Sequence, residues 1–344
     1  MPDEVTPTSS RKADHLRINL EEDVRSARST DLDDIHLPHH ALPELDLAEI
    51  DLSTTFLGKS LHAPILISSM TGGIEQAGRI NQHLAEAAQF HKIAMGVGSQ
   101  RAALEDPAQA QSFRVRKSAP DILLFANLGA VQLNYGYGVE DCLRAVEMIG
   151  ADALILHLNP LQEALQPNGN TNFTSLAIKI EAVCRALPVP VIAKEVGWGI
   201  SAAAAKTLLA CGVQAIDIAG AGGTSWSQVE KHRTDSPKEA FTASLFRAWG
   251  ISTASALTDV RTAYPDVPLI ASGGLRHGVD LAKVLAMQAD LGGFASPMLK
   301  AAAISSEAVV TEIYRIMRET RICMFSSGCK DVPALKSLAL KAAS

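Results

Sequence analysis

The sequence predicts an α/β fold, a (β/α)8 TIM barrel with an N-terminal extension and C-terminal helices. Three observations predict it. Eight short apolar runs rich in Ile, Val and Leu recur along the chain, helix-like segments lie between them, and each run ends in loop-forming residues. The length of 344 residues allows either two domains or one barrel of about 250 residues with extensions.

The eight apolar runs are continuous rather than alternating, which is typical of strands buried on both faces. In chain order they are APILISSM from Ala63, IAMGVGS from Ile93, ILLFANLG from Ile122, ALILHLN from Ala153, VPVIAKEVG from Val189, AIDIAGAGG from Ala215, PLIASGG from Pro268 and LGGFASPM from Leu291. We expect one barrel strand in each run.

Apolar residues recur at helical spacing between the runs. The clearest segments begin at Ile80, Val139, Ser175, Ser201 and Gly278. Ser201 is a suitable helix N-cap, and Gly150 and Gly212 are suitable helix stops. A doubly wound sheet is the alternative, but we would expect fewer strand–helix units from it.

The segments outside the repeat divide the chain into three parts. Residues 1–62 are polar and mixed, and we expect an extension with a short helix and a hairpin that covers the barrel floor. Residues 63–300 form the barrel, and residues 301–344 carry helices around 305–318 and 333–343. The longest interior connection is 222–266, and its stretch 222–240 is polar and helix-poor. A connection of this length predicts a lid over 224–245 or a disordered loop.

Composition excludes several classes of function. Lys and Arg number 31 against 37 Asp and Glu, a net charge of −6, and aromatics make up 5% of the chain. This argues against nucleic-acid and membrane-surface binding, although a local basic pocket for a small anion stays open. No secretory signal or membrane span is expected, and five scattered cysteines favour a reduced cytoplasmic protein.

Chemistry in such barrels lies at the C-terminal ends of the strands. Gly273 and Gly274 follow the seventh run, and Ala295 and Ser296 follow the eighth. Small residues there let backbone N–H groups approach a phosphate, which favours a phosphate site over ordinary tight turns.

Lys194 shares a strand face with Ile192. If that face lines the lumen, the lysine places a positive charge at the barrel mouth beside an anionic cofactor ring. The equally weighted alternative is a structural lysine paired with Asp217 or Glu195.

Other polar residues remain ambiguous from spacing alone. Glu163 could hold Mg²⁺ together with substrate phosphates, but spacing favours a solvated loop glutamate. His157 within an apolar strand is more often a core histidine than an acid or base. Arg11, Lys12 and His15 could grip a diphosphate, but a solvated tail is the simpler interpretation.

Taken together, these segments closely resemble type 2 isopentenyl-diphosphate isomerase, the FMN-dependent family, over most of the chain. The matching motifs are RKADHL from Arg11, SMTGG from Ser69, GSQR from Gly98, NLGA from Asn127, HLNPLQEALQPNG from His157, AKEVGWGIS from Ala193, DIAGAGGTSW from Asp217, WGIST from Trp249, ASGGLRHGVD from Ala271 and ASP from Ala295. Their order and combination carry the resemblance. Two departures are small: ISSMTGG at the first strand, and NTNF after QPNG, where an acidic residue is common.

The resemblance implies roles for named residues. It implies FMN contacts for Ser69, Met70, Thr71, Ser99, Asn127, Lys194, Thr224, Gly273, Gly274, Arg276, Ala295 and Ser296. It implies substrate contacts for Arg11, Lys12, His15, Ser99, Arg101, His157, Asn159 and Gln162, with Gln162 beside the reacting alkene. Gln162, His157 and Lys194 are the expected catalytic residues, and Glu163 the expected Mg²⁺ ligand.

The implied reaction interconverts isopentenyl and dimethylallyl diphosphate in isoprenoid biosynthesis, by proton addition and elimination. It needs reduced FMN, which is electron-rich and can carry protons, so NADPH or another reductant is expected. The resemblance also implies a homotetramer or homo-octamer.

The main alternative is an FMN-dependent 2-hydroxy-acid oxidase or dehydrogenase. Such enzymes need a histidine base near the end of the sixth strand, where this chain reads AGAGGTSWSQ, with no histidine before His232. A non-catalytic flavin- or phosphate-binding scaffold would not need Arg11, Lys12, Gln162 and Glu163 together.

Overall fold

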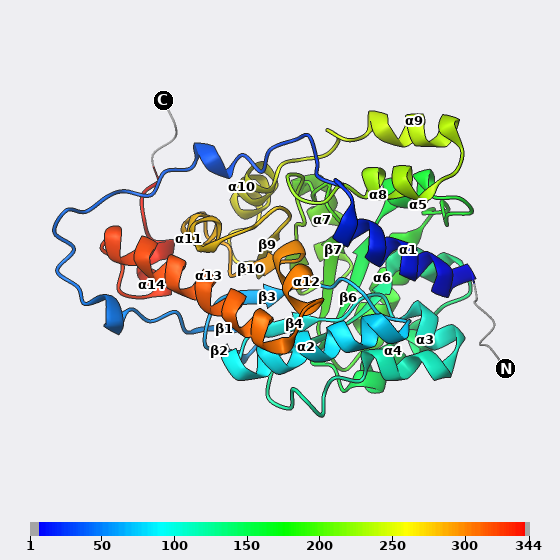
Figure 1. The fold of residues 1–344 in the computed structure, drawn as a ribbon, viewed down its shortest axis with the longest axis horizontal. Helices are drawn as coiled ribbons and strands as arrows, with labels where there is room; N and C mark the ends of the chain where they lie inside the picture. The colour runs from blue at the N-terminus through cyan, green and yellow to red at the C-terminus, as the bar shows by residue number, and fades with distance from the viewer. Residues whose placement is uncertain (1–6, 341–344) are drawn as a thin grey trace.

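The computed structural model describes residues 7–340, and its centre is a closed barrel of eight parallel strands (Figure 1). Around the barrel the order is β10-β3-β4-β5-β6-β7-β8-β9. The strands are β3 (Ile65–Ile67), β4 (Ala94–Gly96), β5 (Leu124–Gly129), β6 (Ala153–Leu158), β7 (Val191–Glu195), β8 (Ala215–Asp217), β9 (Leu269–Ser272) and β10 (Leu291–Phe294). Each lies in one of the eight predicted runs, so the barrel prediction is confirmed.

Helices surround this barrel and connect its strands (Figure 1). They are α1 (Pro7–Glu21), α2 (Glu75–His91), α3 (Arg101–Glu105), α4 (Val139–Ile149), α5 (Pro160–Leu165), α6 (Leu176–Ala186), α7 (Ala202–Ala210), α8 (Trp226–Arg233), α9 (Pro237–Leu245), α10 (Thr253–Ala263), α11 (Gly278–Ala286), α12 (Ser296–Ala302), α13 (Ser306–Ser326) and α14 (Val332–Lys336). The Ser201 hydroxyl caps α7 by accepting from the Ala204 N–H, and Gly150 ends α4 in the left-handed conformation, both as predicted.

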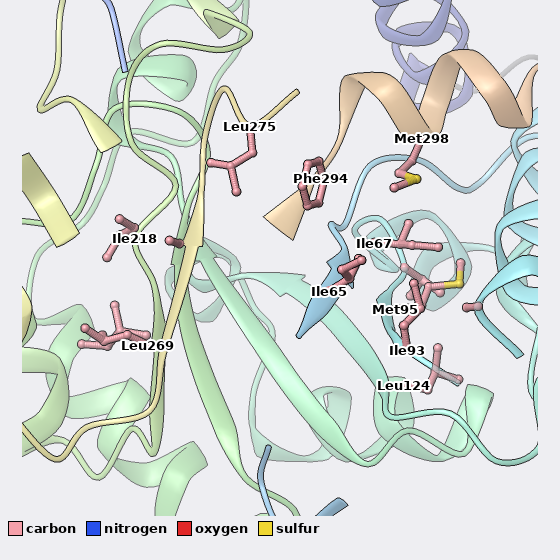
Figure 2. Close-up of a cluster of buried hydrophobic side chains, with 14 of the residues drawn as sticks. Ile65, Ile67, Ile93, Met95, Leu124, Ile218, Leu269, Leu275, Phe294 and Met298 are labelled. Atoms are coloured by element: carbon pink, nitrogen blue, oxygen red, sulfur yellow. The ribbon is translucent and has the colours of Figure 1, made fainter. Parts of the chain in front are cut away.

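The outward faces of the strands pack against these helices. Figure 2 shows part of this layer, in which Ile65, Ile67, Met95, Leu124 and Phe294 belong to one buried cluster. This is why the strands read as continuous apolar runs: one set of side chains fills the space under the helices and the alternate set fills the lumen.

The lumen has an apolar lower layer. Leu66, Phe125 and Ile270 belong to a second cluster that also contains Phe56 and Leu61. Those two residues come from an antiparallel hairpin, β1 (Thr54–Phe56) and β2 (Lys59–Leu61), so the predicted hairpin that covers the barrel floor is confirmed. Because side chains alternate along a strand, the residues two positions further on form the next layer toward the mouth.

An ionic clamp ties the beginnings of β5 and β6 together. The Arg116 guanidinium donates to the carbonyl oxygen of Gly150 and, through Nη2, to Asp152 Oδ2 at 2.7 Å. Asp152 Oδ2 also accepts the Leu124 N–H at 2.8 Å, and Lys59 of the hairpin lies 3.4 Å from Oδ1.

The same arrangement recurs at the beginnings of β9 and β10. Arg261 donates to the carbonyl oxygen of Gln288 and to Asp290 Oδ2 at 3.0 Å. Asp290 Oδ2 accepts the Leu269 N–H at 2.8 Å, and Lys336 pairs with Oδ1 at 2.5 Å. The two clamps fix two strand pairs, β5–β6 and β9–β10, on opposite sides of the barrel.

We expect Arg116→Met and Arg261→Met each to lower the free energy of unfolding by about 2–3 kcal/mol, because each change leaves backbone carbonyls without donors. Urea unfolding measures this, with Arg185→Met as the matched control, since that guanidinium is exposed and, within residues 7–340, pairs only with Glu181. A loss no larger than that of the control would mean that the clamps do not hold the strands.

The prediction that residues 222–240 are poor in helix is wrong. They carry α8 and the first turn of α9, which is begun by the hydroxyl of Ser236. The buried face of α8 consists largely of polar residues, including Gln228 and Glu230, so it lacks the apolar periodicity that marks a helix.

The C-terminal helices also differ in extent from the prediction. The first continues to Ser326, well past residue 318, and the second, α14, ends at Lys336 rather than near residue 343. Residues 341–344 lie outside the described part of the chain. No helix within residues 7–340 is long and apolar enough to cross a membrane.

Candidate active site

A polar layer lies above the apolar floor of the lumen. His157 Nδ1 lies 2.8 Å from Asn127 Oδ1, Lys194 Nζ lies 3.2 Å from Asp217 Oδ2, and Ser272 Oγ donates to Asp217 Oδ1 at 2.5 Å. Lys194 therefore lines the lumen and pairs with Asp217, so the structural alternative drawn from the sequence is confirmed. Its place beside a cofactor ring stays a prediction. This layer forms the base of any site at the barrel mouth.

The hydrogen bonds of Asn127 define the tautomer of His157. The Asn127 amide donates to the Val97 carbonyl oxygen at 3.1 Å, so its own oxygen is the acceptor and His157 Nδ1 carries the proton. Burial, followed by the charges of Lys12 and Lys194, lowers the pKa of His157 to about 3. At neutral pH this side chain is an uncharged imidazole whose Nε2 is a hydrogen-bond acceptor.

The first strand ends in hydroxyls that fit a flavin. Ser68 Oγ and Ser69 Oγ are buried and make no hydrogen bond within the described chain. Opposite Ser69, a Cβ at Gly96 would lie 2.4 Å from the hydroxyl, so only glycine leaves the space. Unpartnered buried hydroxyls beside such a gap are the donors and acceptors that a polar ring system needs.

The turn after β9 has the backbone approach that a phosphate requires. Gly273 and Gly274 have φ values of +101° and +80°, and a Cβ at Gly273 would lie 2.0 Å from the Gly220 carbonyl oxygen. Ala295 and Ser296 follow β10 and are exposed. The proposed FMN residues here therefore lie on adjacent strand ends, with glycine required at the turn.

The other residues with expected FMN contacts occupy varied positions. Thr71 is buried, Met70, Ser99 and Thr224 are partly buried, and the carboxyl group of Glu195 accepts three backbone N–H bonds in the turn after Lys194. The Arg276 side chain is 61% exposed and lies 3.7 Å from Asp280, so its guanidinium faces solvent rather than the lumen.

The helix α1 carries three basic residues, Arg11, Lys12 and His15. It packs against α8 through Ile18 and Val229, which brings these residues to the barrel mouth (Figure 1). Within residues 7–340, the side chains of Arg11 and Lys12 form no hydrogen bond or ion pair. Burial, with the nearby charges of Arg11 and Arg101, lowers the pKa of Lys12 to about 8. Several cations that repel one another at one place form a site for a multiply charged anion.

Glu163 is buried rather than solvated, on α5 directly after β6. Its Oε1 accepts from Asn159 at 3.0 Å, and its Oε2 accepts from the Asn170 N–H at 2.6 Å and from Gln166. Asn159 Oδ1 is buried without a hydrogen bond within the described chain. A carboxylate beside a free amide oxygen is a donor set that suits Mg²⁺.

Arg101, at the start of α3, is joined to Glu163 through the loop that follows α5. It donates to Glu105 Oε1 at 2.7 Å and to Asn170 Oδ1 at 3.1 Å. Asn170 thus joins the arginine to Glu163, and the loop after α5 is part of the site. Arg101 is therefore brought beside the other residues expected to contact substrate.

Two residues of α8 were not found from the sequence. Glu230 lies 3.0 Å from His15 Nε2 and 3.4 Å from Gln162 Nε2, and its other oxygen accepts from Arg233 Nε at 2.7 Å. Burial would raise the pKa of Glu230, but His15 and Arg233 together lower it. Glu230 thus joins α1, α5 and α8. The sequence could not reveal this contact, because its segment was interpreted as a lid or a disordered loop.

Comparison with known proteins identifies the family. Residues 157–342 match the model of the FMN-dependent dehydrogenases. Isopentenyl-diphosphate delta-isomerase from Nostoc sp. is 55% identical over 96% of this chain and 94% of its own, and that of Xanthobacter autotrophicus is 52% identical over 96% of each. The chain belongs to the isopentenyl-diphosphate delta-isomerase family. The match to the FMN-dependent model identifies it as the FMN-dependent type and supports FMN as its cofactor.

Solved structures of other enzymes share the isomerase family's barrel. Mandelate oxidase with a monooxide FMN adduct has a TM-score of 0.65 at 17% identity, over 95% of this chain and 91% of its own. A lactate oxidase from Pediococcus acidilactici also has a TM-score of 0.65 at 17% identity, over 95% and 86%. At this identity the likeness concerns the fold alone.

Proposed function

We propose that the protein interconverts isopentenyl and dimethylallyl diphosphate by adding a proton to the alkene and removing another from a neighbouring carbon. One observation carries the proposal. The cations of α1, the buried Glu163 and Gln162 converge beside the polar layer that contains Lys194. An anion site next to a flavin site holds a diphosphate by one end and exposes its alkene to the ring.

Reduced FMN, when bound, supplies an electron-rich ring that stabilises positive charge and carries protons. The chain positions that group through Ser69, Asn127, Gly273 and Gly274. The Lys194 ammonium, buried beside Asp217, favours an anionic reduced ring at the base of the site. Ser296 and the remaining residues predicted to contact FMN would complete the contacts, apart from the solvent-facing side chain of Arg276.

The diphosphate binds to Arg11, Lys12 and Arg101. Glu163 would hold Mg²⁺, which would neutralise charge on the diphosphate, since Mg²⁺ is usually bound by one or two carboxylates plus substrate phosphates. His15, Ser99, His157 and Asn159 complete the substrate pocket. Neutral His157 donates a hydrogen bond from Nδ1–H to the Asn127 oxygen, so only its Nε2 is left to accept a hydrogen bond from substrate or Lys12.

Gln162 is held beside the reacting carbons by two hydrogen bonds. Its oxygen accepts from Asn159 at 3.1 Å, and its nitrogen lies 3.4 Å from Glu230. An amide does not change its charge near neutral pH, so Gln162 orients the alkene and the transferred proton. Positioning of this kind supplies several kcal/mol of the barrier.

We extend the proposal to the setting of the reaction. The protein acts in isoprenoid biosynthesis in the cytoplasm, takes its electrons from NADPH, and assembles as a homotetramer or homo-octamer. Residues 1–62 form a substrate-binding extension, 63–300 the FMN-binding barrel and 301–344 the C-terminal helices. The packing of α1 on α8 supports the role of the extension.

Oxidation of 2-hydroxy acids is the competing function. The first histidine after β8, His232, is exposed and lies 3.7 Å from Glu22, on the outer side of α8. To decide, the oxidised FMN-loaded protein is mixed anaerobically with lactate or mandelate, and flavin bleaching is followed. The proposal predicts no bleaching with either acid and bleaching with NADPH, whereas rapid bleaching by a hydroxy acid would favour oxidation.

The pKa of Lys12 predicts a pH dependence. Because that pKa is lowered to about 8, the ammonium form is lost as pH rises through that value, so kcat/KM should fall above pH 8. Lys12→Arg should move this fall to higher pH, and Lys12→Ala should mainly raise KM. A profile that Lys12→Arg leaves unchanged, with an unchanged KM in Lys12→Ala, would exclude Lys12 from the diphosphate site.

A further inference from the structure

Arg233 is the last residue of α8 and lies outside the motifs that carry the family resemblance. Its Nε donates to Glu230 Oε2 at 2.7 Å, which fixes the plane of the guanidinium. The Arg233 side chain is only 14% exposed, and its Nη2 is buried. This nitrogen has no hydrogen-bond partner within the described chain. A buried charged donor without an acceptor is costly unless a ligand satisfies it.

The unpaired Nη2 of Arg233 lies among other basic side chains. Arg233 lies close enough to Arg11 and to His15 that its charge lowers the pKa of both groups, after the larger effect of burial. Arg101 of α3 also lowers the pKa of Arg11, and Asn170 joins Arg101 to Glu163 on α5. Cations from α1, α3 and α8 therefore face one another around a common space.

The carboxylates at this place do not neutralise all of these cations. Glu230 is shared by His15 and Arg233, and Glu163 accepts from Asn159, Gln166 and a backbone N–H. Neither carboxylate forms a hydrogen bond with Arg11 in the described chain. An anion with several oxygens would satisfy Arg11 and the free Nη2 of Arg233 together.

We propose that Arg233 is a diphosphate-binding residue, with Glu230 acting as the group that orients it. This rests on the proposed function, because that function supplies the diphosphate. The Arg233 guanidinium binds phosphate oxygens from the side of α8. This helix, which the sequence pattern did not predict, therefore forms one wall of the substrate site.

The test is the affinity for inorganic pyrophosphate, measured by calorimetry on the FMN-loaded protein with Mg²⁺. Arg233→Gln should raise the Kd at least about tenfold, as expected for the loss of a charge-assisted hydrogen bond. The KM for isopentenyl diphosphate should rise by a similar factor, with kcat at saturation nearly unchanged. Arg185→Gln, which removes an exposed arginine, is the control and should leave both constants unchanged.

The outcomes separate the two proposals. An unchanged Kd in a variant that keeps its FMN and melting temperature would make Arg233 only a partner of Glu230, and the inference would be overturned. If the unaltered protein fails to bind pyrophosphate, the diphosphate site itself is wrong and the proposed function fails with it. Should Arg233→Gln not fold, Arg233→Lys decides, because lysine can pair with Glu230 but lacks the second donor group. It must then bind pyrophosphate several-fold more weakly.

Discussion

Glu163→Ala is expected to reduce kcat/KM for isopentenyl diphosphate by about a hundredfold or more while FMN stays bound. The carboxylate is the metal ligand in the proposed site, and metal-assisted charge neutralisation contributes several kcal/mol. Each 1.36 kcal/mol corresponds to a factor of ten in rate. The measurement is turnover as a function of Mg²⁺ concentration, together with the FMN content of the purified variant.

Two controls separate the metal from the fold. Glu163→Gln keeps the shape of the side chain, so it should lose activity with little loss of stability, and Glu181→Ala removes an exposed helix carboxylate and should be neutral. Full Mg²⁺-dependent activity in Glu163→Ala would remove Glu163 from the metal site.

Lys194→Met is expected to lower both the free energy of unfolding and the activity. Its effect on stability is the largest that we predict. It leaves Asp217 buried without its counter-ion, and breaking a buried pair in this way costs about 3–5 kcal/mol. Loss of the ammonium should also raise the pKa at which the reduced flavin ionises, because Lys194 would no longer stabilise the anionic ring. Chemical denaturation and a pH titration of the reduced flavin spectrum measure the two effects.

A double variant separates these two roles of Lys194. Asp217→Asn added to Lys194→Met removes the unpaired charge and keeps an acceptor for Ser272, so much of the stability should return. Activity should stay low, because the flavin still lacks its cation. Recovery of activity along with stability would mean that Lys194 serves only the fold.

The barrel could be predicted because its strands obey a simple rule. Residues such as Ile65 and Leu66 face the helices and the lumen in turn, and both faces are apolar, so the run is unbroken. The same period of two put Lys194 on one strand face with Ile192, and the structure shows that this face lines the lumen. The sequence left open whether the lysine was paired, because the Asp217 contact spans two strands and depends on their register.

The walls of the site could not be predicted from local pattern. His15 and Glu230 meet across 215 positions, and α8 lacks apolar periodicity because its buried residues, which include Gln228 and Glu230, are mostly polar. Spacing alone favoured a solvated Glu163, since its burial depends on Gln166 and Asn170 folding back onto it. The resemblance to the family pointed to Glu163 as a site residue, whereas only the packing in the structure pointed to Arg233.

The measurement that tests the central claim most directly is product formation from isopentenyl diphosphate in D₂O, followed by NMR under anaerobic conditions with FMN, Mg²⁺ and a small amount of NADPH. The proposal predicts dimethylallyl diphosphate that carries deuterium, in many turnovers for each NADPH consumed, because protons move and no net oxidation occurs. An unchanged alkene, or product formed in step with NADPH consumption, would contradict it.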